Sequence, residues 1–414
     1  MNNPLLVGVD PHRKKNVTQM MDRQGQTVGK AVRTDNNRPG TKALVIELVK
    51  ALENGGFDGV QIATEATGWY WLPFLQALNE DDDLAQWPVD LYALNPRLTA
   101  KFKQTYSDRD KADHLDAFVI ADRLRMGRDL PQPFQGDDSY FPLRLLTRHR
   151  RHVVLGLVRE KSYFLALLYL KASEYTHSDK QPFSTVFGAT SRAVIQEFSS
   201  MEEIAALPLE DLAEFIDAKG KRRFADPAHN AQLLHQVATD SYQLPQPWLQ
   251  SVNMVLRLSL QHITALERQM KRLDTAISDL MASIPHTLDT IPGFGPVYSA
   301  GIIAEIAGVE RFDFDHAKVA KYAGLRWRHS GSADFQAEDT PLSRSGNAHL
   351  RYYLCEAANI VRMHDADYRA YYQRKHSEVP KHRHKRAIVL TARKLVRLVV
   401  RLLTTNQPYR PRRP

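Results

Sequence analysis

The sequence predicts an α/β domain followed by mostly helical segments, and three patterns support this fold class. The first 130 residues alternate between short apolar runs, typical of buried strands, and amphipathic helical windows. Residues 141–171 and the stretch after Pro247 show apolar side chains at helical spacing over many turns. Glycine-rich turns separate further helical windows after Leu288. We expect an α/β domain at 1–135, a helical region at 136–285 with an insertion at about 173–245, a mostly helical domain at 286–405 and a basic tail at 406–414.

Composition excludes several classes of protein. The chain has 414 residues and 43% hydrophobic content, enough for two or three buried cores. The 56 Lys and Arg against 47 Asp and Glu give a net charge of +9, which favours a polyanionic partner such as nucleic acid. The single cysteine, Cys355, excludes an internal disulfide and a cysteine-cluster zinc site, and it suits a reducing cytoplasm. We find neither a signal peptide nor an apolar run of about 18 residues, so we expect no membrane span.

The first domain is predicted to carry acidic residues at the ends of its strands. An apolar strand over Leu5–Val9 runs directly into Asp10, and a second strand over Val60–Thr64 runs into Glu65. Burying an unpaired carboxylate costs several kcal/mol, so an acid in such a place needs a cation or a donor nearby. The other expected elements are a hairpin within 16–34, helices over 42–52 and 69–78, a strand over 89–96 and a basic helix from Pro96.

A further helix is predicted over residues 108–127, and it also carries carboxylates. Asp113 and Asp116 are three positions apart in it and therefore share a face. Together with the two strand ends, this helix could bring carboxylates to one edge of a sheet, as in enzymes that transfer phosphoryl groups with paired Mg²⁺ ions. Asp108 and Asp110 compete for the same role, and spacing alone does not choose between the pairs. Any one of these acids taken alone is usually a cap or a solvated residue, and their joint arrangement is more informative.

Three segments of this domain resemble the DEDD signature of insertion-sequence transposases of the one-ten family, whose relatives include the Piv-type pilin-gene invertases and the bridge-RNA-guided recombinases. The segments are Asp10–Asn16 (DPHRKKN), Ala63–Tyr70 (ATEATGWY) and Lys111–Ala117 (KADHLDA). The resemblance implies a RuvC-like, ribonuclease H fold whose Mg²⁺-binding catalytic acids are Asp10, Glu65, Asp113 and Asp116. Family members commonly show K-T-D in the third segment, whereas this chain has Ala112 in place of the threonine. The difference therefore affects a neighbour of the acids and not a metal ligand.

Four segments of the last domain match the same family in the same order, and the two sets together span about four fifths of the chain. They are Ile291–Pro296 (IPGFGP), Ala323–Leu325 (AGL), His329–Gly331 (HSG) and Leu342–Arg351 (LSRSGNAHLR). The resemblance implies that Ser330 is the nucleophile that joins covalently to DNA, because the serine of the family's S-G block has this role. By composition alone, Ser330 is one serine among several in this region.

Small and basic residues of the last domain are expected to bind nucleic acid. A Gly-x-Gly turn would let backbone N–H groups approach a phosphate at the following helix N-terminus, although tight helix packing explains the same motif. Guanidinium groups would clamp the phosphate, and the basic run at 374–395 suits an RNA or DNA backbone better than a metal. The expected contacts are Gly293, Gly295, Arg326, Arg328, Arg344, Asn347, Arg351, Lys385 and Arg386.

The helical middle region offers less chemistry. The arginines of the first long helix are explained either by a solvated face or by nucleic-acid contact; they are Arg144, Arg148, Arg150, Arg151 and Arg159. Heptad spacing from Ile263 to Leu280 predicts a coiled coil, within one chain or between subunits. In the insertion, Ser200 and Glu203 predict a capping box, and a later helix is expected to end at Gly220.

We therefore predict a transposase or DNA recombinase of a mobile element, acting on donor and target DNA in the cytoplasm at the nucleoid. The resemblance implies a homodimer that assembles to a tetramer, and it alone implies a guide RNA. Two alternatives stay open. A RuvC-type structure-selective nuclease would use the same acids with water as the nucleophile, and a non-catalytic nucleic-acid-binding protein would tolerate the replacement of Asp10 and Glu65.

Overall fold

A computed structural model of the chain describes residues 1–106, 113–128, 130–136, 138–176, 181–327, 331–332, 335–336, 342–343 and 345–411, with backbone alone at 113–114, 331–332 and 335–336. The chain divides into two compact units, residues 1–139 and 140–414, which we describe separately. Within the described residues, no helix combines the length and the apolar character needed to cross a lipid bilayer.

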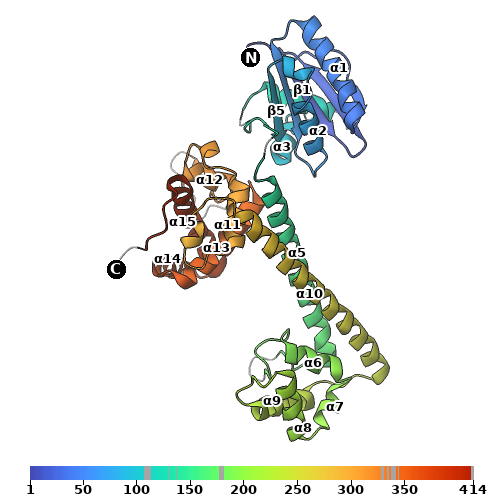
Figure 1. Cartoon of the computed structure of the whole chain (residues 1–414), viewed down its shortest axis with the longest axis vertical. Helices are drawn as coiled ribbons and strands as arrows, with labels where there is room; N and C mark the ends of the chain where they lie inside the picture. The colour runs from blue at the N-terminus through green and yellow to red at the C-terminus, as the bar shows by residue number, and fades with distance from the viewer. Residues whose placement is uncertain are drawn as a thin grey trace. The chain divides into compact units, whose positions relative to one another are not determined.

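The first unit is a five-stranded mixed sheet with helices on both faces (Figure 1). The strand order is β3-β2-β1-β4-β5, in which β1, β4 and β5 are parallel while β2 and β3 are antiparallel to their neighbours. The predicted α/β character is confirmed. The elements are β1 Pro4–Pro11, β2 Lys15–Met21, β3 Val32–Asp35, α1 Arg38–Gly55, β4 Gly59–Glu65, α2 Trp71–Asn79, η1 Leu84–Gln86, β5 Val89–Leu94, α3 Pro96–Lys103 and α4 Asp113–Arg125.

Alternate residues of β1 face opposite sides of the sheet, and this alternation decides where the acids lie. Val7 and Val9 pack beneath α1 and α2, whereas Leu6 belongs to a second core beneath α4. By the same alternation, Asp10 lies on the α4 side. The strand does not end at Val9 as predicted, because β1 continues through Asp10 to Pro11 in antiparallel pairing with β2.

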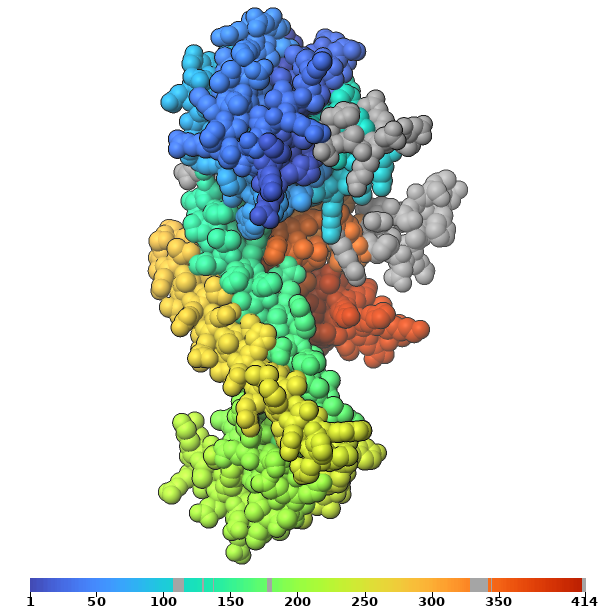
Figure 2. Space-filling view, turned by 90° about the vertical axis from the view of Figure 1, so that its right-hand side faces the viewer, coloured from blue at the N-terminus to red at the C-terminus, as the bar shows by residue number. Residues whose placement is uncertain are grey.

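Two long antiparallel helices, α5 Phe141–Lys171 and α10 Gln246–Met281, form the frame of the second unit (Figures 1 and 2). At one end, Leu143 of α5 and Ile277 of α10 belong to the core of the C-terminal helices. At the other end, Leu168 and Leu256 belong to the core of residues 172–245, which we call the tip domain. Both long helices begin within one residue of the predicted positions, because a proline stands in the first turn of each.

The tip domain is a group of short helices: α6 Ala189–Glu197, α7 Met201–Ala205, α8 Leu209–Lys219 and α9 Pro227–Asp240. The hydroxyl of Ser200 accepts a hydrogen bond from the backbone N of Glu203 (3.2 Å), as predicted. The return bond of the capping box is shifted by one residue, because the Glu203 carboxylate accepts from the backbone N of Ser199 (2.7 Å). Helix α8 ends at Lys219 with Gly220 as its C-cap, which also confirms the prediction.

The C-terminal part of the second unit is mostly helical, as predicted. Helices α11, α13 and α15 share one large core, which also contains residues of α5 and α10. The elements are η3 Leu288–Thr290, α11 Pro296–Ile306, η4 Glu310–Phe312, α12 His316–Tyr322, β6 Gly331–Ser332, β7 Phe335–Gln336, α13 Ala348–His364, α14 Ala366–Ser377 and α15 Arg383–Thr405.

Three of the arginines of α5 bind other parts of the unit. Arg148 donates two hydrogen bonds to the carboxylate of Glu305, from Nε at 2.7 Å and from Nη2 at 2.8 Å. Arg150 pairs with Asp274 of α10, and Arg144 Nε donates to a backbone carbonyl of α11 at 2.9 Å. Neither a solvated face nor nucleic-acid contact, the two explanations open from the sequence, accounts for these three side chains. They fasten α5 to α10 and α11.

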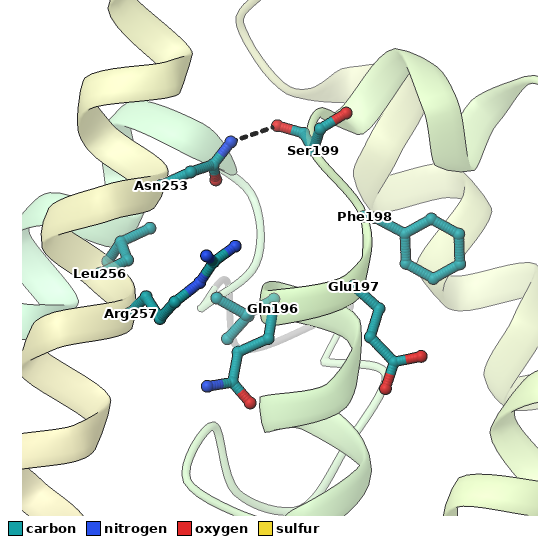
Figure 3. A pocket seen from close by; sticks show the side chains of 8 residues that line it. Gln196, Glu197, Phe198, Ser199, Asn253, Leu256 and Arg257 are labelled. Carbon is teal, nitrogen blue, oxygen red and sulfur yellow. Dashed lines mark hydrogen bonds between the residues drawn. The ribbon is translucent and has the colours of Figure 1, made fainter.

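Lys171, the last residue of α5, is 2% exposed and ties the tip domain to the long helices. Its Nζ donates to the carbonyl of Ile195 (2.8 Å), the carbonyl of Phe198 (2.6 Å) and the Oδ1 of Asn253 (2.6 Å). The amide nitrogen of Asn253 in turn donates to the carbonyl of Ser199 at the wall of a small cavity (Figure 3). Burial lowers the pKa of Lys171 to about 8, so the ammonium form still dominates at neutral pH.

Replacing Lys171 with Met should destabilise the junction between α5 and the tip domain. Two buried carbonyls and the part-buried amide oxygen of Asn253 would lose their donor, and each unsatisfied buried acceptor costs about 1–3 kcal/mol. The matched control is Lys271→Met, because Lys271 is exposed on α10 and its loss should change stability by less than about 0.5 kcal/mol. Urea unfolding of the full chain and the rate of proteolysis within 172–245 measure the difference. Equal behaviour of the two variants would refute the anchoring role of Lys171.

Candidate active site

Two of the predicted catalytic acids lie side by side on neighbouring strands. Strands β1 and β4 are parallel, and their register pairs Val9 with Thr64. The next residues along the two strands are Asp10 and Glu65, which therefore face the same side of the sheet, towards α4. The strand pairing thus joins two acids that are 55 positions apart in the sequence.

Helix α4 adds a third acid by lying very close to β1. A Cβ atom placed on Gly8 would overlap the carbonyl oxygen of Ala117 and the amide nitrogen of Ala121, both in the backbone of α4. Glycine is therefore required at position 8 for the helix to approach the strand at this distance. Asp116 precedes Ala117, so the close approach carries its carboxylate towards the end of β1 that holds Asp10.

The pKa of Glu65 is shifted by its surroundings, which include the other two acids. Burial raises the pKa of Glu65, and the carboxylates of Asp10 and Asp116 raise it further, while a hydrogen bond from the Thr67 hydroxyl (3.3 Å) and the charge of Lys103 act in the opposite direction. The carboxylates of Asp10 on β1 and Asp116 on α4 therefore both lie within electrostatic reach of Glu65 on β4.

Basic side chains lie beside two of these acids. His12 Nε2 lies 3.1 Å from Asp10 Oδ2, so a protonated His12 would pair with that carboxylate. Lys103, at the end of α3, forms an ion pair with Asp116. The sequence predicts a basic helix in this region but does not single out Lys103, because nothing in the linear order relates it to a residue 13 positions later.

The donor set fits a divalent cation. Carboxylate oxygens are the ligands that Mg²⁺ prefers, and a cation between Asp10, Glu65 and Asp116 would relieve the repulsion that, together with burial, raises the pKa of Glu65. In the described part of the chain, no group of three His, Cys, Asp or Glu side chains is close enough together to hold a metal as it stands. Asp113 begins α4 one turn before Asp116, and its side chain lies outside the described residues.

The predicted nucleophile Ser330 lies outside the described residues, as do Arg328 and Arg344. Described residues on either side of them hold the chain together: Ser343 N donates to the carbonyl of Arg326 at 2.8 Å, and Trp327 forms a β-bridge with Leu342. Arg326 itself is exposed. The two ends of the segment that contains Ser330 are therefore joined at its base.

Asn347, a predicted nucleic-acid contact, is held inside the C-terminal domain. Its Oδ1 caps α13 by accepting from the backbone N of His349 (2.9 Å) and of Leu350 (3.0 Å). Its Nδ2 donates to the carboxylate of Glu305 at 2.6 Å and to the hydroxyl of Tyr322 at 3.1 Å. Asn347 thus joins the start of α13 to α11 and α12, a role that the sequence does not reveal.

The carboxylate of Glu305 is the centre of this network, and sequence reasoning missed it. Glu305 is 1% exposed; burial by itself raises its pKa, but the hydrogen bonds and charge of Arg148 and the amide of Asn347 hold the pKa below its usual value. Arg351 adds a bond from Nη1 to the carbonyl of Ala323 at 2.9 Å. Nothing in the apolar run of α11 marks Glu305 as paired, because its partners come from distant segments.

The two glycines of the predicted phosphate-binding turn differ. A Cβ on Gly293 would lie 2.6 Å from Ile360 and 2.8 Å from His364, and its φ is +84°, so tight packing against α13 explains this glycine. Gly295 is the N-cap of α11, and no atom lies within 4 Å of the position its Cβ would take. The N-terminus of α11 has no side-chain cap.

The last two predicted contacts belong to α15. Lys385 is exposed, whereas Arg386 Nη1 donates to the carboxylate of Glu378 (2.9 Å) and to the carbonyl of Lys375 (3.2 Å). Arg386 therefore links α15 to the end of α14.

Comparisons with known proteins identify the family. A family model described as a transposase, of the DEDD type of IS110, matches residues 7–171, and a second, described as the transposase IS116/IS110/IS902 family, matches residues 285–373. The chain belongs to the IS110 family of transposases. The resemblance seen in the sequence motifs is thereby confirmed. Neither match covers the tip domain of this transposase.

Two relatives of this transposase are proteins of insertion elements. The "Insertion element IS900 uncharacterized 42 kDa protein" of Mycobacterium paratuberculosis is 25% identical over 311 residues, which is 74% of this chain and 75% of the relative. The "Insertion element IS116 uncharacterized 44.8 kDa protein" of Streptomyces clavuligerus is 24% identical over 330 residues, which is 77% of each chain.

The substitution Gly8→Ala should disturb the transposase at the crossing of α4 and β1. The added methyl group meets backbone atoms that cannot rotate away, so we expect a loss of about 1–3 kcal/mol or more in unfolding free energy. The control is Gly295→Ala, where the added group meets no atom within 4 Å. Chemical denaturation of both variants measures the effect. A Gly8→Ala protein as stable as the control would contradict the required close approach.

Proposed function

We propose that this transposase cuts and rejoins DNA through a covalent phosphoserine at Ser330, with Asp10, Glu65, Asp113 and Asp116 binding Mg²⁺. The observation that carries the proposal is the convergence of Asp10, Glu65 and Asp116 from β1, β4 and α4. The mixed sheet, with acids on its central strand, on the neighbouring strand and on a helix crossing them, supports assigning this unit to the RuvC-like, ribonuclease H type.

The proposed reaction exchanges one phosphoester for another. The Oγ of Ser330 attacks the phosphorus, the bond to the 3′ oxygen breaks, and the 3′ oxygen leaves as a hydroxyl after taking up a proton. The 5′ phosphate stays on the serine until another 3′ hydroxyl displaces it. Because each step conserves one phosphoester bond, strand exchange needs no ATP. Bound Mg²⁺ would supply positive charge at the oxygens of the scissile phosphate.

The chain's own residues position the reacting groups. The sheet and α4 hold the carboxylates, and Lys103, together with His12 when protonated, balances part of their charge while DNA is absent. In the second unit, the network of Glu305, Arg148 and Asn347 joins α5, α11 and the start of α13.

We also propose that the α5–α10 pair is a coiled coil that assembles two subunits, which then form a tetramer. Each helix exposes apolar side chains at spacings of three, four or seven residues, parallel to the stripe it buries, and a second subunit would cover them. These side chains are Leu155, Val158, Leu165 and Tyr169 on α5, and Trp248, Val255 and Leu258 on α10.

The proposed partners are donor and target DNA and a guide RNA, met in the cytoplasm at the nucleoid. The net charge of +9 supports polyanionic partners. The guide RNA is supported by the resemblance to bridge-RNA-guided recombinases. A second candidate function, a RuvC-type nuclease, is favoured by the same three carboxylates, and it would use water in place of Ser330.

Trapping with end-labelled DNA separates these two functions. The full-length protein should form a covalent adduct that maps to Ser330, and Ser330→Ala should abolish it because the attacking oxygen is gone. Ser332→Ala is the matched control and should keep at least about half of the adduct, since a neighbouring serine has no part in the bond. DNA cleavage without any adduct would support the nuclease, and an adduct on another residue would refute the proposed nucleophile.

Metal binding can be measured without catalysis. Added Mg²⁺ should raise the melting temperature of the full-length protein, since a ligand that binds the folded state stabilises it. Asp10→Asn and Glu65→Gln should each remove most of this rise and lower DNA cleavage by about 10²-fold or more. Asp35→Asn is the control, because Asp35 lies on β3 in an ion pair with Lys15. A rise that persists in both acid variants would contradict the proposed site.

A further inference from the structure

A cavity in the tip domain contains none of the site residues predicted from the sequence. The turn that follows α8 and the first residues of α6 line an open cavity of about 350 Å³. The residues that line it are Ala189, Thr190, Lys219, Gly220, Lys221, Arg223 and Phe224. We call it the tip pocket.

The core of the tip domain holds the turn in place. A Cβ on Gly220 would overlap the ring of Phe224, so glycine lets the chain close over this ring. Phe224 packs with Phe183 in the tip core, at 5.9 Å between ring centroids. Backbone N–H groups of Lys221 and Arg222 donate to carbonyls of the last turn of α8, at 3.1 and 2.9 Å. The cations of the turn are thus presented from a fixed backbone.

Positive charge is concentrated at the tip pocket. Four of the six Lys and Arg residues in 172–245 lie between 219 and 223. Lys219 pairs with Glu197, but among the described residues the charged groups of Lys221, Arg222 and Arg223 form no ion pair or hydrogen bond, and all three are exposed. Such unpaired cations beside a cavity favour an anionic ligand.

The opposite wall of the tip pocket also favours an anion. Helix α6 begins at Ala189, its N-cap Gly188 offers no side-chain cap, and its first turn contains no acidic residue. Its first N–H groups and the positive end of its dipole therefore remain available. Thr190 adds a hydroxyl that lines the cavity in a side chain only 6% exposed, and no hydrogen bond to it is formed by any residue within the described ranges.

We propose that the tip pocket binds a phosphate of a nucleic-acid backbone and that the tip domain is a nucleic-acid-binding module of this transposase. Helix N–H groups, a buried hydroxyl and two cations are the donors that phosphates accept in proteins. The rest of the tip domain is rich in acidic residues, which would direct a polyanion to this one basic turn. The proposal rests on the family's action on DNA and does not depend on the phosphoserine or on Mg²⁺.

The test measures nucleic-acid binding by the full-length protein in EDTA, so that neither metal nor cleavage contributes. Fluorescence anisotropy with duplex DNA, and with a structured RNA of the same length, is recorded over a range of salt. Arg223→Gln removes a cation that lines the pocket, and Arg222→Gln removes a neighbouring cation that does not. Ala189→Glu places a carboxylate at the start of α6, where the charge is favourable for the helix dipole but repels a phosphate. Its control is Gln196→Glu, which adds the same charge near the other end of α6.

Arg223→Gln should weaken binding of DNA, of RNA or of both by about threefold or more and lower the salt dependence by about one phosphate contact. Ala189→Glu should weaken binding at least as much without lowering the melting temperature, whereas Arg222→Gln and Gln196→Glu should change it by less than about twofold. The nucleic acid whose binding falls is the partner. Equal effects of pocket and control variants, or no effect of any, would overturn the proposal. The proposal would also be overturned if inorganic phosphate bound to the tip pocket while the pocket variants bound nucleic acid as tightly as the unchanged protein.

Discussion

Buried charge is the constraint on which both units of this transposase depend. A carboxylate or an ammonium leaves water at a high free-energy cost unless opposite charge or hydrogen-bonding groups replace its hydration. In the second unit this requirement is met in full: Glu305 is bound by Arg148 and Asn347, and Lys171 by three acceptors. These two groups fasten the long helices to the C-terminal helices and to the tip domain.

The first unit meets the same constraint only in part. Asp116 pairs with Lys103 and Asp10 lies beside His12, but Glu65 remains half-buried beside two other carboxylates, and burial and their charge raise its pKa. The fold keeps these acids together because α4 packs directly onto Gly8, and their repulsion is the feature that a divalent cation would relieve. A site that holds unfavourable charge in a fixed place is typical of a functional centre.

The basic turn of the tip domain differs from the paired charges of Glu305 and Lys171 and from the acids of the first unit. Its cations at Lys221, Arg222 and Arg223 are exposed and have no carboxylate partner among the described residues, so they contribute nothing visible to the fold. The arginines of α5 are the opposite case, because Arg144, Arg148 and Arg150 bind groups inside the unit. Composition does not distinguish the cations of the basic turn from the arginines of α5, because it counts charges and not the groups that each charge contacts.

The sequence by itself determined the order and type of the main elements, both long helices, the capping box at Ser200 and the family, because apolar spacing, caps and motifs are local properties of the chain. It also supplied Asp10, Glu65 and Asp116 as candidates. Their convergence, the pairing of Lys103 and the network around Glu305 were decided only by tertiary structure. The reason is physical: strand register and helix packing set distances between residues far apart in the chain, and no local pattern encodes those distances.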